Sequence, residues 1–404
     1  MPSRAHAPAP RLGELADQLL LPDLLRAGGA AARPDRLVAA LVLVIVVLFT
    51  AISLSGDPRD AGGLRVAVGQ IELAVSGFSN SLLRADFGSL TDRFRLLLIE
   101  APETAIRSAP GATAGLVTVF VLFWGIAGLY ISRGAGMELG RRIRVRPGRL
   151  FTFLRVRGVS AVLSLLLPPL IVSLLLLAPL VLGAMMRVPG LDIAAGLLYG
   201  LGLASTFAAA FLVVAWLVAG WMLIPSVACD GADPFDATQR SFGMLLSRPL
   251  GVLTHAAVAV LQGVVLIGLV WIVADLAIGF AETVSGAAGE RATWIASGIA
   301  AETENAGSAR NASHFVIVWK AIAYLLVAAY GVSYAHTAST AVYLNARKMV
   351  DGQEPSELWM PGDAAGVVPV NADRRPASVR SASDQLAAVP APADADPGSS
   401  EPRG

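Results

Sequence analysis

An arginine-rich stretch between two long apolar runs constrains this chain more than any other feature of its sequence. Residues 133–157 hold eight arginines against a single acid, Glu138. The apolar run on each side is long enough to cross the roughly 30 Å of hydrocarbon in a bilayer. Short loops rich in Lys and Arg stay on the cytoplasmic side during insertion. The pattern therefore predicts a polytopic membrane protein that is oriented around this basic loop.

The composition agrees with a membrane protein and argues against several other classes. Of the 404 residues, 55% are hydrophobic and only 15% are charged, a balance typical of transmembrane chains. A formal net charge of +1 does not suit a nucleic-acid partner. The single cysteine, Cys229, excludes an intramolecular disulfide and leaves no thiols for a cysteine-based zinc site. We predict no cofactor, no metal and no nucleic-acid partner.

The apolar runs predict an all-α, polytopic transmembrane helical bundle of about six spans. An even number of crossings places both termini in the cytoplasm, which agrees with the basic residues at the inner ends of the runs. The predicted spans cover residues 37–54, 112–131, 159–186, 193–224, 250–272 and 315–344.

Three further segments surround the spans of the predicted transmembrane domain, residues 37–350. Residues 1–36 carry leucines at helical spacing and predict a cytoplasmic segment with an amphipathic helix. Residues 55–111 contain two apolar patterns of three-four spacing, which predict two amphipathic helices outside the membrane. Residues 351–404 are rich in Pro, Ala, Ser and Asp and predict a disordered cytoplasmic tail.

Local signals add two expectations about helix geometry. Ser89 and Asp92 resemble a capping box that opens the second amphipathic helix of the 55–111 segment. The third span contains Pro168, Pro169 and Pro179. Because each proline removes a backbone donor, we expect this span to be bent or discontinuous.

Small residues recur at four-residue intervals in the fourth span. Such a stripe lets the backbones of two helices approach closely, so we expect it to be a packing face. The stripe comprises Gly196, Gly200, Ala204 and Ala208.

A second inner loop follows Pro225 and predicts a short helix along the membrane surface. Asp233 suits the N-cap, Pro234 the first helical position, and Asp236 pairs with Arg240 at helical spacing. Asp230, Asp233 and Asp236 also form a group of carboxylates, but their spacing differs from that of a calcium loop. We therefore favour helix capping over a metal site.

At this loop the chain resembles a group of uncharacterised bacterial polytopic membrane proteins, and more distantly the membrane domain fused to some glycerophosphodiester phosphodiesterases. The residues that carry the resemblance are Asp233, Phe235, Asp236, Arg240, Ser241 and Phe242, with Tyr343 to Gly352 at the end of the last helix. The resemblance implies a multi-pass protein of the bacterial inner membrane and brings no established activity. No phosphodiesterase domain is present, so that chemistry is not expected here.

Polar side chains on the fifth and sixth spans form a candidate intramembrane cluster, because ionisable groups at membrane depth are costly. Interhelical hydrogen bonding explains it, and a substrate or proton pocket is the alternative. The cluster comprises His255, Gln262, Ser333, His336, Thr337 and Thr340. Near the outer ends of the same spans, Asp275 and Lys320 are expected either to pair or to reach headgroups separately.

The sequence holds no Ser/His/Asp grouping, His-Glu zinc motif or Walker loop, so we predict no enzyme. The preferred hypothesis is a non-catalytic accessory or scaffold component of the inner membrane. The competing hypothesis is a small-molecule or lipid-linked transporter with a polar pocket between spans five and six. The lipid bilayer is the expected partner, with anionic headgroups at the Arg133–Arg157 loop. A membrane-protein partner and a homo-oligomer both remain open.

Overall fold

The computed structural model describes residues 24–55, 86–302 and 307–360, and every regular element in these ranges is helical. By length and composition, six helices in these ranges are able to cross a membrane. The predicted all-α polytopic fold is therefore confirmed. The six are α4 (Pro34–Ser55), α8 (Pro110–Arg141), α9 (Pro147–Met185), α10 (Leu191–Ala219) with its continuation to Asp230, α13 (Pro249–Gly286) and α16 (Ser308–Asp351).

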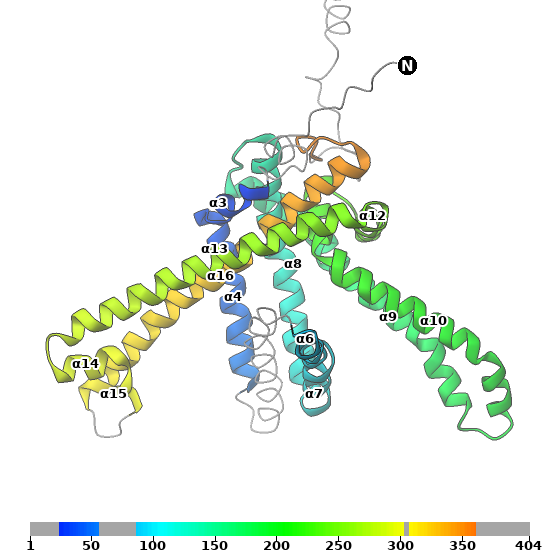
Figure 1. Ribbon diagram of the computed structural model, residues 1–404, viewed down its shortest axis with the longest axis horizontal. Coiled ribbons are helices and arrows are strands. Elements are labelled where there is room, and N and C mark those ends of the chain that lie inside the picture. The colour runs from blue at the N-terminus through cyan, green and yellow to red at the C-terminus, as the bar shows by residue number, and fades with distance from the viewer. Residues whose placement is uncertain (1–23, 56–85, 303–306, 361–404) are drawn as a thin grey trace, which may run out of the picture.

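The six long helices are arranged as three pairs that join at one end and diverge toward the other (Figure 1). The pairs are α4 with α8, α9 with α10, and α13 with α16. We name the joined end the hub and the opposite end the distal end. The first described helix and the last described residues both lie at the hub (Figure 1).

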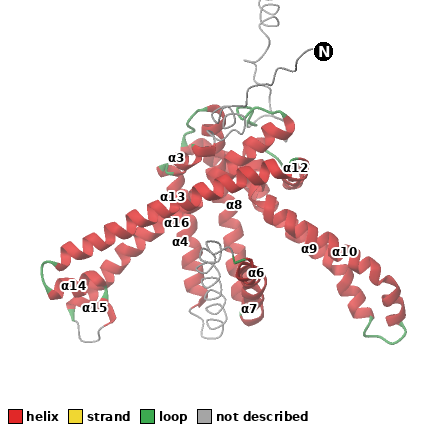
Figure 2. Cartoon of the chain, in the orientation of Figure 1, coloured by secondary structure: helices red, strands yellow, loops and turns green. Residues whose placement is uncertain are grey.

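Shorter helices lie at both ends, and the loops within the described ranges are short (Figure 2). The hub contains α3 (Ala27–Ala31), the 3₁₀ turn η2 (Gly220–Met222), α11 (Leu223–Asp230) and α12 (Pro234–Ser247). The remaining elements are α6 (Phe87–Arg95), the π-helical turn η1 (Leu96–Glu100), α7 (Ala101–Ser108), α14 (Glu290–Ser297) and α15 (Ile299–Glu302).

The third span was predicted to be bent or discontinuous, and the discontinuous alternative is wrong. Helix α9 includes Pro168, Pro169 and Pro179 without a break. A transmembrane helix tolerates proline where local hydroxyls and neighbouring helices satisfy the freed carbonyls. Within α9, the Ser173 hydroxyl also donates to the Pro169 carbonyl oxygen at 2.8 Å.

The fourth span departs from the prediction at its hub end. The α-helix stops at Ala219, passes through η2 and restarts as α11, which contains Pro225. Proline is tolerated there because it lies in the first turn of the new helix. The second inner loop is accordingly shorter than predicted, since α11 continues to Asp230 and α12 begins at Pro234, as predicted.

The predicted packing stripe on α10 does not pack on any described part of the chain, because its four small residues are exposed. Helix α10 packs on α9 through the opposite face, where Ala195, Gly202 and Ala209 are buried. A Cβ added at Gly202 would lie 2.8 Å from Leu182 Cδ1. The stripe at Gly196, Gly200, Ala204 and Ala208 is left uncovered by the described chain.

The described part of the 55–111 segment lies beside α8 at the distal end (Figure 1). Its helix α6 is capped one turn before the predicted capping box, because Asp86 accepts from the Ser89 backbone N–H at 3.1 Å. The first predicted amphipathic helix of this segment lies outside the described residues.

Candidate functional site

A buried carboxylate, Asp230, lies at the centre of the hub. Its side chain is completely buried, and so is that of Arg347, whose Nη1 lies 2.5 Å from Asp230 Oδ1. The Tyr343 hydroxyl donates to Asp230 Oδ2 at 2.5 Å, and Arg240 Nη1 lies 3.0 Å from the same oxygen. Two arginines and one tyrosine hydroxyl thus bind this carboxylate, which would be costly to bury without partners.

Local structure explains how these groups meet. Asp230 is the last residue of α11, and the next residue, Gly231, turns the chain with φ +62°. A residue with a Cβ is strained in that conformation. On α16, Tyr343 and Arg347 are four residues apart and therefore share one face. Helix α12 supplies Arg240 from the third side.

A second ion-pair group joins the start of the chain to α8. Glu138 lies 2.5 Å from Arg33 Nη2 and 2.7 Å from Arg36 Nη2. Arg36 is buried and also donates to the Ala30 carbonyl at 2.6 Å. Helices α3 and α4 are thereby fixed to the hub end of α8.

Residues 352–360, which we name the clasp, close over the hub. The Trp359 backbone N–H donates to the Cys229 carbonyl at 2.8 Å, and the Trp359 ring is buried. Arg133 donates to the carbonyls of Ala228 and Trp359, at 2.8 and 2.7 Å. The predicted disorder beyond Asp351 is therefore wrong for these residues, and residues 361–404 lie outside the described ranges.

The basic stretch is only partly a surface loop. Its non-helical part is residues 142–146, because α8 continues to Arg141 and α9 starts at Pro147. Arg141 donates to the carbonyls of Ser356 and Leu358 in the clasp. Arg157 lies over the Trp359 ring. The exposed arginines are Arg142, Arg144, Arg146, Arg149 and Arg155.

The predicted intramembrane cluster is divided between two sides of α16. Gln262 donates to the Leu25 carbonyl at 2.8 Å and accepts from the Tyr334 hydroxyl at 3.2 Å. Ser333 donates to the Ala31 carbonyl at 2.7 Å. His336 instead packs on α8, with its ring centroid 4.5 Å from that of Trp124. The structure therefore does not bring Gln262 and His336 into one pocket.

The remaining cluster residues bond within their own helices or stay buried. A ring nitrogen of His255 contacts the Gly251 carbonyl at 2.8 Å, and Thr340 donates to the His336 carbonyl at 2.7 Å. His336 Nε2 and Thr337 Oγ1 are buried and have no hydrogen-bond partner among the described residues. The hydrogen bonds of His255 and Thr340 to carbonyls of their own helices are typical of transmembrane helices.

The loop motif functions mainly as local structure. Asp233 caps α12 as predicted, accepting from the Asp236 backbone N–H at 2.8 Å. Phe235 is exposed, Phe242 packs against the core and Ser241 is fully buried. The described residues contain no group of three or more His, Cys, Asp or Glu side chains that would hold a metal ion.

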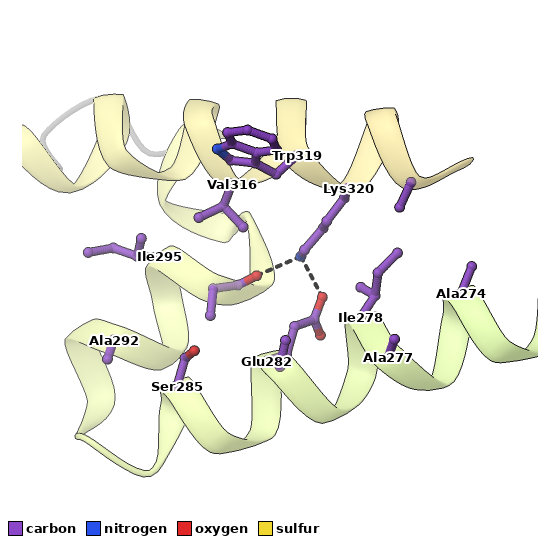
Figure 3. Close-up of a pocket in the computed structure, with 13 residues that line it drawn as sticks. Ala274, Ala277, Ile278, Glu282, Ser285, Ala292, Ile295, Val316, Trp319 and Lys320 are labelled. Atoms are coloured by element: carbon purple, nitrogen blue, oxygen red, sulfur yellow. Dashed lines mark hydrogen bonds and ion pairs between the residues drawn. The ribbon is translucent and has the colours of Figure 1, made fainter. Parts of the chain in front are cut away.

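At the distal end, Lys320 projects from α16 into a pocket and forms an ion pair with Glu282 of α13 (Figure 3). It also donates to the Ala296 carbonyl of α14 at 2.6 Å. Asp275, for which we expected either a pair with Lys320 or separate contact with headgroups, accepts from the Tyr324 hydroxyl at 3.0 Å. Asp275 and Glu282 are two helical turns apart on one face, so sequence spacing did not distinguish them.

Comparison of the chain with protein-family models, with curated proteins and with solved structures finds no match.

Proposed function

We propose that this chain is a non-catalytic scaffold of the bacterial inner membrane, whose divergent helix pairs hold other membrane-embedded helices. Support comes from the contrast between its two ends. The hub is fixed by buried ion pairs and by the clasp, whereas the three pairs separate toward the distal end (Figure 1). Such an architecture holds hairpins at fixed directions and leaves their sides open to partners.

The observation that carries the proposal is the uncovered stripe on α10. Gly196, Gly200, Ala204 and Ala208 are exposed on the face opposite the one that packs on α9. A Cβ added at Gly196 or Gly200 would meet nothing within 4 Å. Helix association in membranes depends on close backbone approach, which small residues permit. A partner helix is therefore the proposed occupant of this face.

The transport alternative has weaker support. It requires His255, Gln262 and His336 to line one cavity. Gln262 instead contacts Leu25, two residues before α3, and Tyr334, whereas His336 packs on Trp124 of α8. A further part of the proposal is contact between the hub and anionic headgroups. The five exposed arginines near the hub support it, because each arginine contributes about 1 kcal/mol of binding free energy near a charged membrane surface.

Thiol-directed photo-crosslinking in native membranes tests the scaffold. The only natural thiol, Cys229, is fully buried. Ala204→Cys and Ala210→Cys, both at exposed alanines of α10, would each carry a thiol-reactive photo-crosslinker. We expect a discrete protein adduct from position 204, on the stripe, and none from position 210, about 120° around the helix.

A bulky substitution in the stripe provides the control. Gly200→Leu has open space around its side chain, so the fold should persist while the adduct is lost. The mass of the adduct distinguishes a second copy of this chain from a different protein. Equal adducts from both positions, or none from either, would contradict the proposal.

A further inference from the structure

The distal pocket between α13, α14 and α16 has the form of a binding site. Its volume is about 560 Å³, within the range of roughly 300 to 1,000 Å³ that is common for ligand sites. Six lining residues are alanines, whose small side chains leave the space open, and Ile278, Ile295 and Val316 add apolar surface (Figure 3). The alanines are Ala274, Ala277, Ala281, Ala292, Ala296 and Ala323.

One ion pair supplies the charges that line this apolar pocket. Lys320 is largely buried at 20% exposure, and Glu282 is 38% exposed. The Lys320 ammonium has three N–H donors, of which Glu282 and the Ala296 carbonyl use two. Glu282 is bound through one of its two oxygens. The pair therefore offers the pocket both a donor and an acceptor.

The pocket lies at the depth of a lipid headgroup. About 40 Å of helix separates Lys320 from Arg347 in the hub, at roughly 1.5 Å per residue. A bilayer is about 40 to 45 Å thick including its headgroups. Helix α16 runs obliquely to α4 and α8 (Figure 1), so the depth of Lys320 is less than this helix length. With the hub at one membrane surface, Lys320 therefore lies near the acyl-headgroup boundary of the opposite leaflet. The neighbouring Trp319 is largely exposed, as expected of an interfacial anchor.

From this geometry we infer that the pocket binds a phospholipid whose headgroup carries both a phosphate and a primary ammonium. The phosphate accepts from Lys320, the ammonium donates to Glu282, and an acyl chain fills the alanine-lined space. A purely anionic lipid would leave its charge beside the Glu282 carboxylate. A quaternary amine would give Glu282 no N–H donor. The alternative is that the ion pair only holds α13 against α16. That role would not require the open pocket beside the pair.

The test uses the full-length protein in nanodiscs with photoactivatable phosphatidylethanolamine, and the labelled peptides are mapped by mass spectrometry. We expect labelling within residues 274–296 and 316–323. Unlabelled phosphatidylethanolamine should compete more strongly than phosphatidylcholine or phosphatidylglycerol. Lys320→Met should reduce labelling about tenfold, the factor that corresponds to losing one charge-assisted hydrogen bond.

Two further variants separate binding from folding. Ala277→Leu fills the pocket and leaves both charges in place, so labelling should fall while the thermal unfolding midpoint is retained. Arg107→Met removes a cation from another ion pair, with Glu103, that is exposed on α7, and should leave labelling unchanged. Equal competition by all three lipids, preferential competition by phosphatidylglycerol, or undiminished labelling of Ala277→Leu would overturn the inference.

Discussion

At the scale of single residues, the hub depends on the balance of charge around Asp230. This carboxylate and the Arg347 guanidinium are both fully buried, so neither has water to replace a lost partner. Removing one member of a buried ion pair is more harmful than removing both, because the remaining charge stays desolvated. The same reasoning applies less strongly to Arg240, which is partly exposed.

The Arg347→Met substitution tests this balance. We expect it to lower the free energy of unfolding by about 3 to 5 kcal/mol, measured by thermal or denaturant unfolding in detergent. Adding Asp230→Asn to the same chain should recover part of the loss, because no buried carboxylate is then left without Arg347, and the Arg240 charge is partly exposed to water. A double variant that is less stable than Arg347→Met would contradict the account.

The N-cap of α12 gives a smaller prediction. Asp233→Ala should destabilise the protein by about 1 kcal/mol, because the Asp236 backbone N–H loses its acceptor. Asp233→Ser keeps an oxygen at the cap and should retain most of the stability. Unfolding curves of the two variants in the same detergent compare them directly, and equal losses would rule out capping.

These two residues show what sequence alone reveals. The Asp233 cap was predicted because it depends on three neighbouring residues. The partners of Asp230 were not predicted, because Arg347 and Tyr343 lie more than 100 positions away. A helix cap can be predicted from adjacent residues, whereas an ion pair across the hub depends on how distant helices pack together.

At the scale of elements, the clasp is the clearest difference between expectation and structure. Composition over the whole of residues 351–404 predicts disorder, and this average conceals the apolar cluster at Leu358 and Trp359, both buried in the hub. A long-range signal was present in the arginines of α8, since Arg133 and Arg141 hold the clasp through its carbonyls. Spacing within α8 does not reveal that contact.

Replacing the clasp tryptophan should loosen the hub. Trp359→Ala removes a buried ring that packs on Phe153 and lies beneath Arg157, and should cost about 3 to 5 kcal/mol of unfolding free energy. Phe235→Ala is the matched control, because that aromatic side chain is exposed on α12. Equal effects of the two substitutions on the unfolding midpoint would show that the clasp does not stabilise the hub.

At the scale of the whole molecule, the crossings were predictable and their arrangement was not. Apolar length alone identified six helices, because each must match the thickness of hydrocarbon. The divergence of the three pairs was not predicted, since hydropathy carries no information about helix tilt or neighbours. For the same reason the sequence did not reveal that α10 packs on α9 through Ala195, Gly202 and Ala209.

The predicted orientation has a direct test at two exposed arginines. Arg144 lies in the connection between α8 and α9 at the hub, and Arg187 lies between α9 and α10 at the distal end. A thiol at Arg144→Cys should react with an impermeant reagent only in inverted membrane vesicles, and one at Arg187→Cys only in right-side-out vesicles. The opposite pattern would contradict the predicted orientation. The same pattern at both positions would contradict a crossing by α9, and with it the count of six.

The clasp also sets an order of assembly. The ribosome synthesises residues 347–360 after the earlier helices. Until then Asp230 lacks its partner Arg347, and Arg133 lacks the Trp359 carbonyl as an acceptor. A nascent chain that stops before this point keeps the Arg240 partner of Asp230 and the Ala228 acceptor of Arg133, but lacks Arg347 and the Trp359 carbonyl. Among the described residues of the hub, this segment is therefore the last to be synthesised.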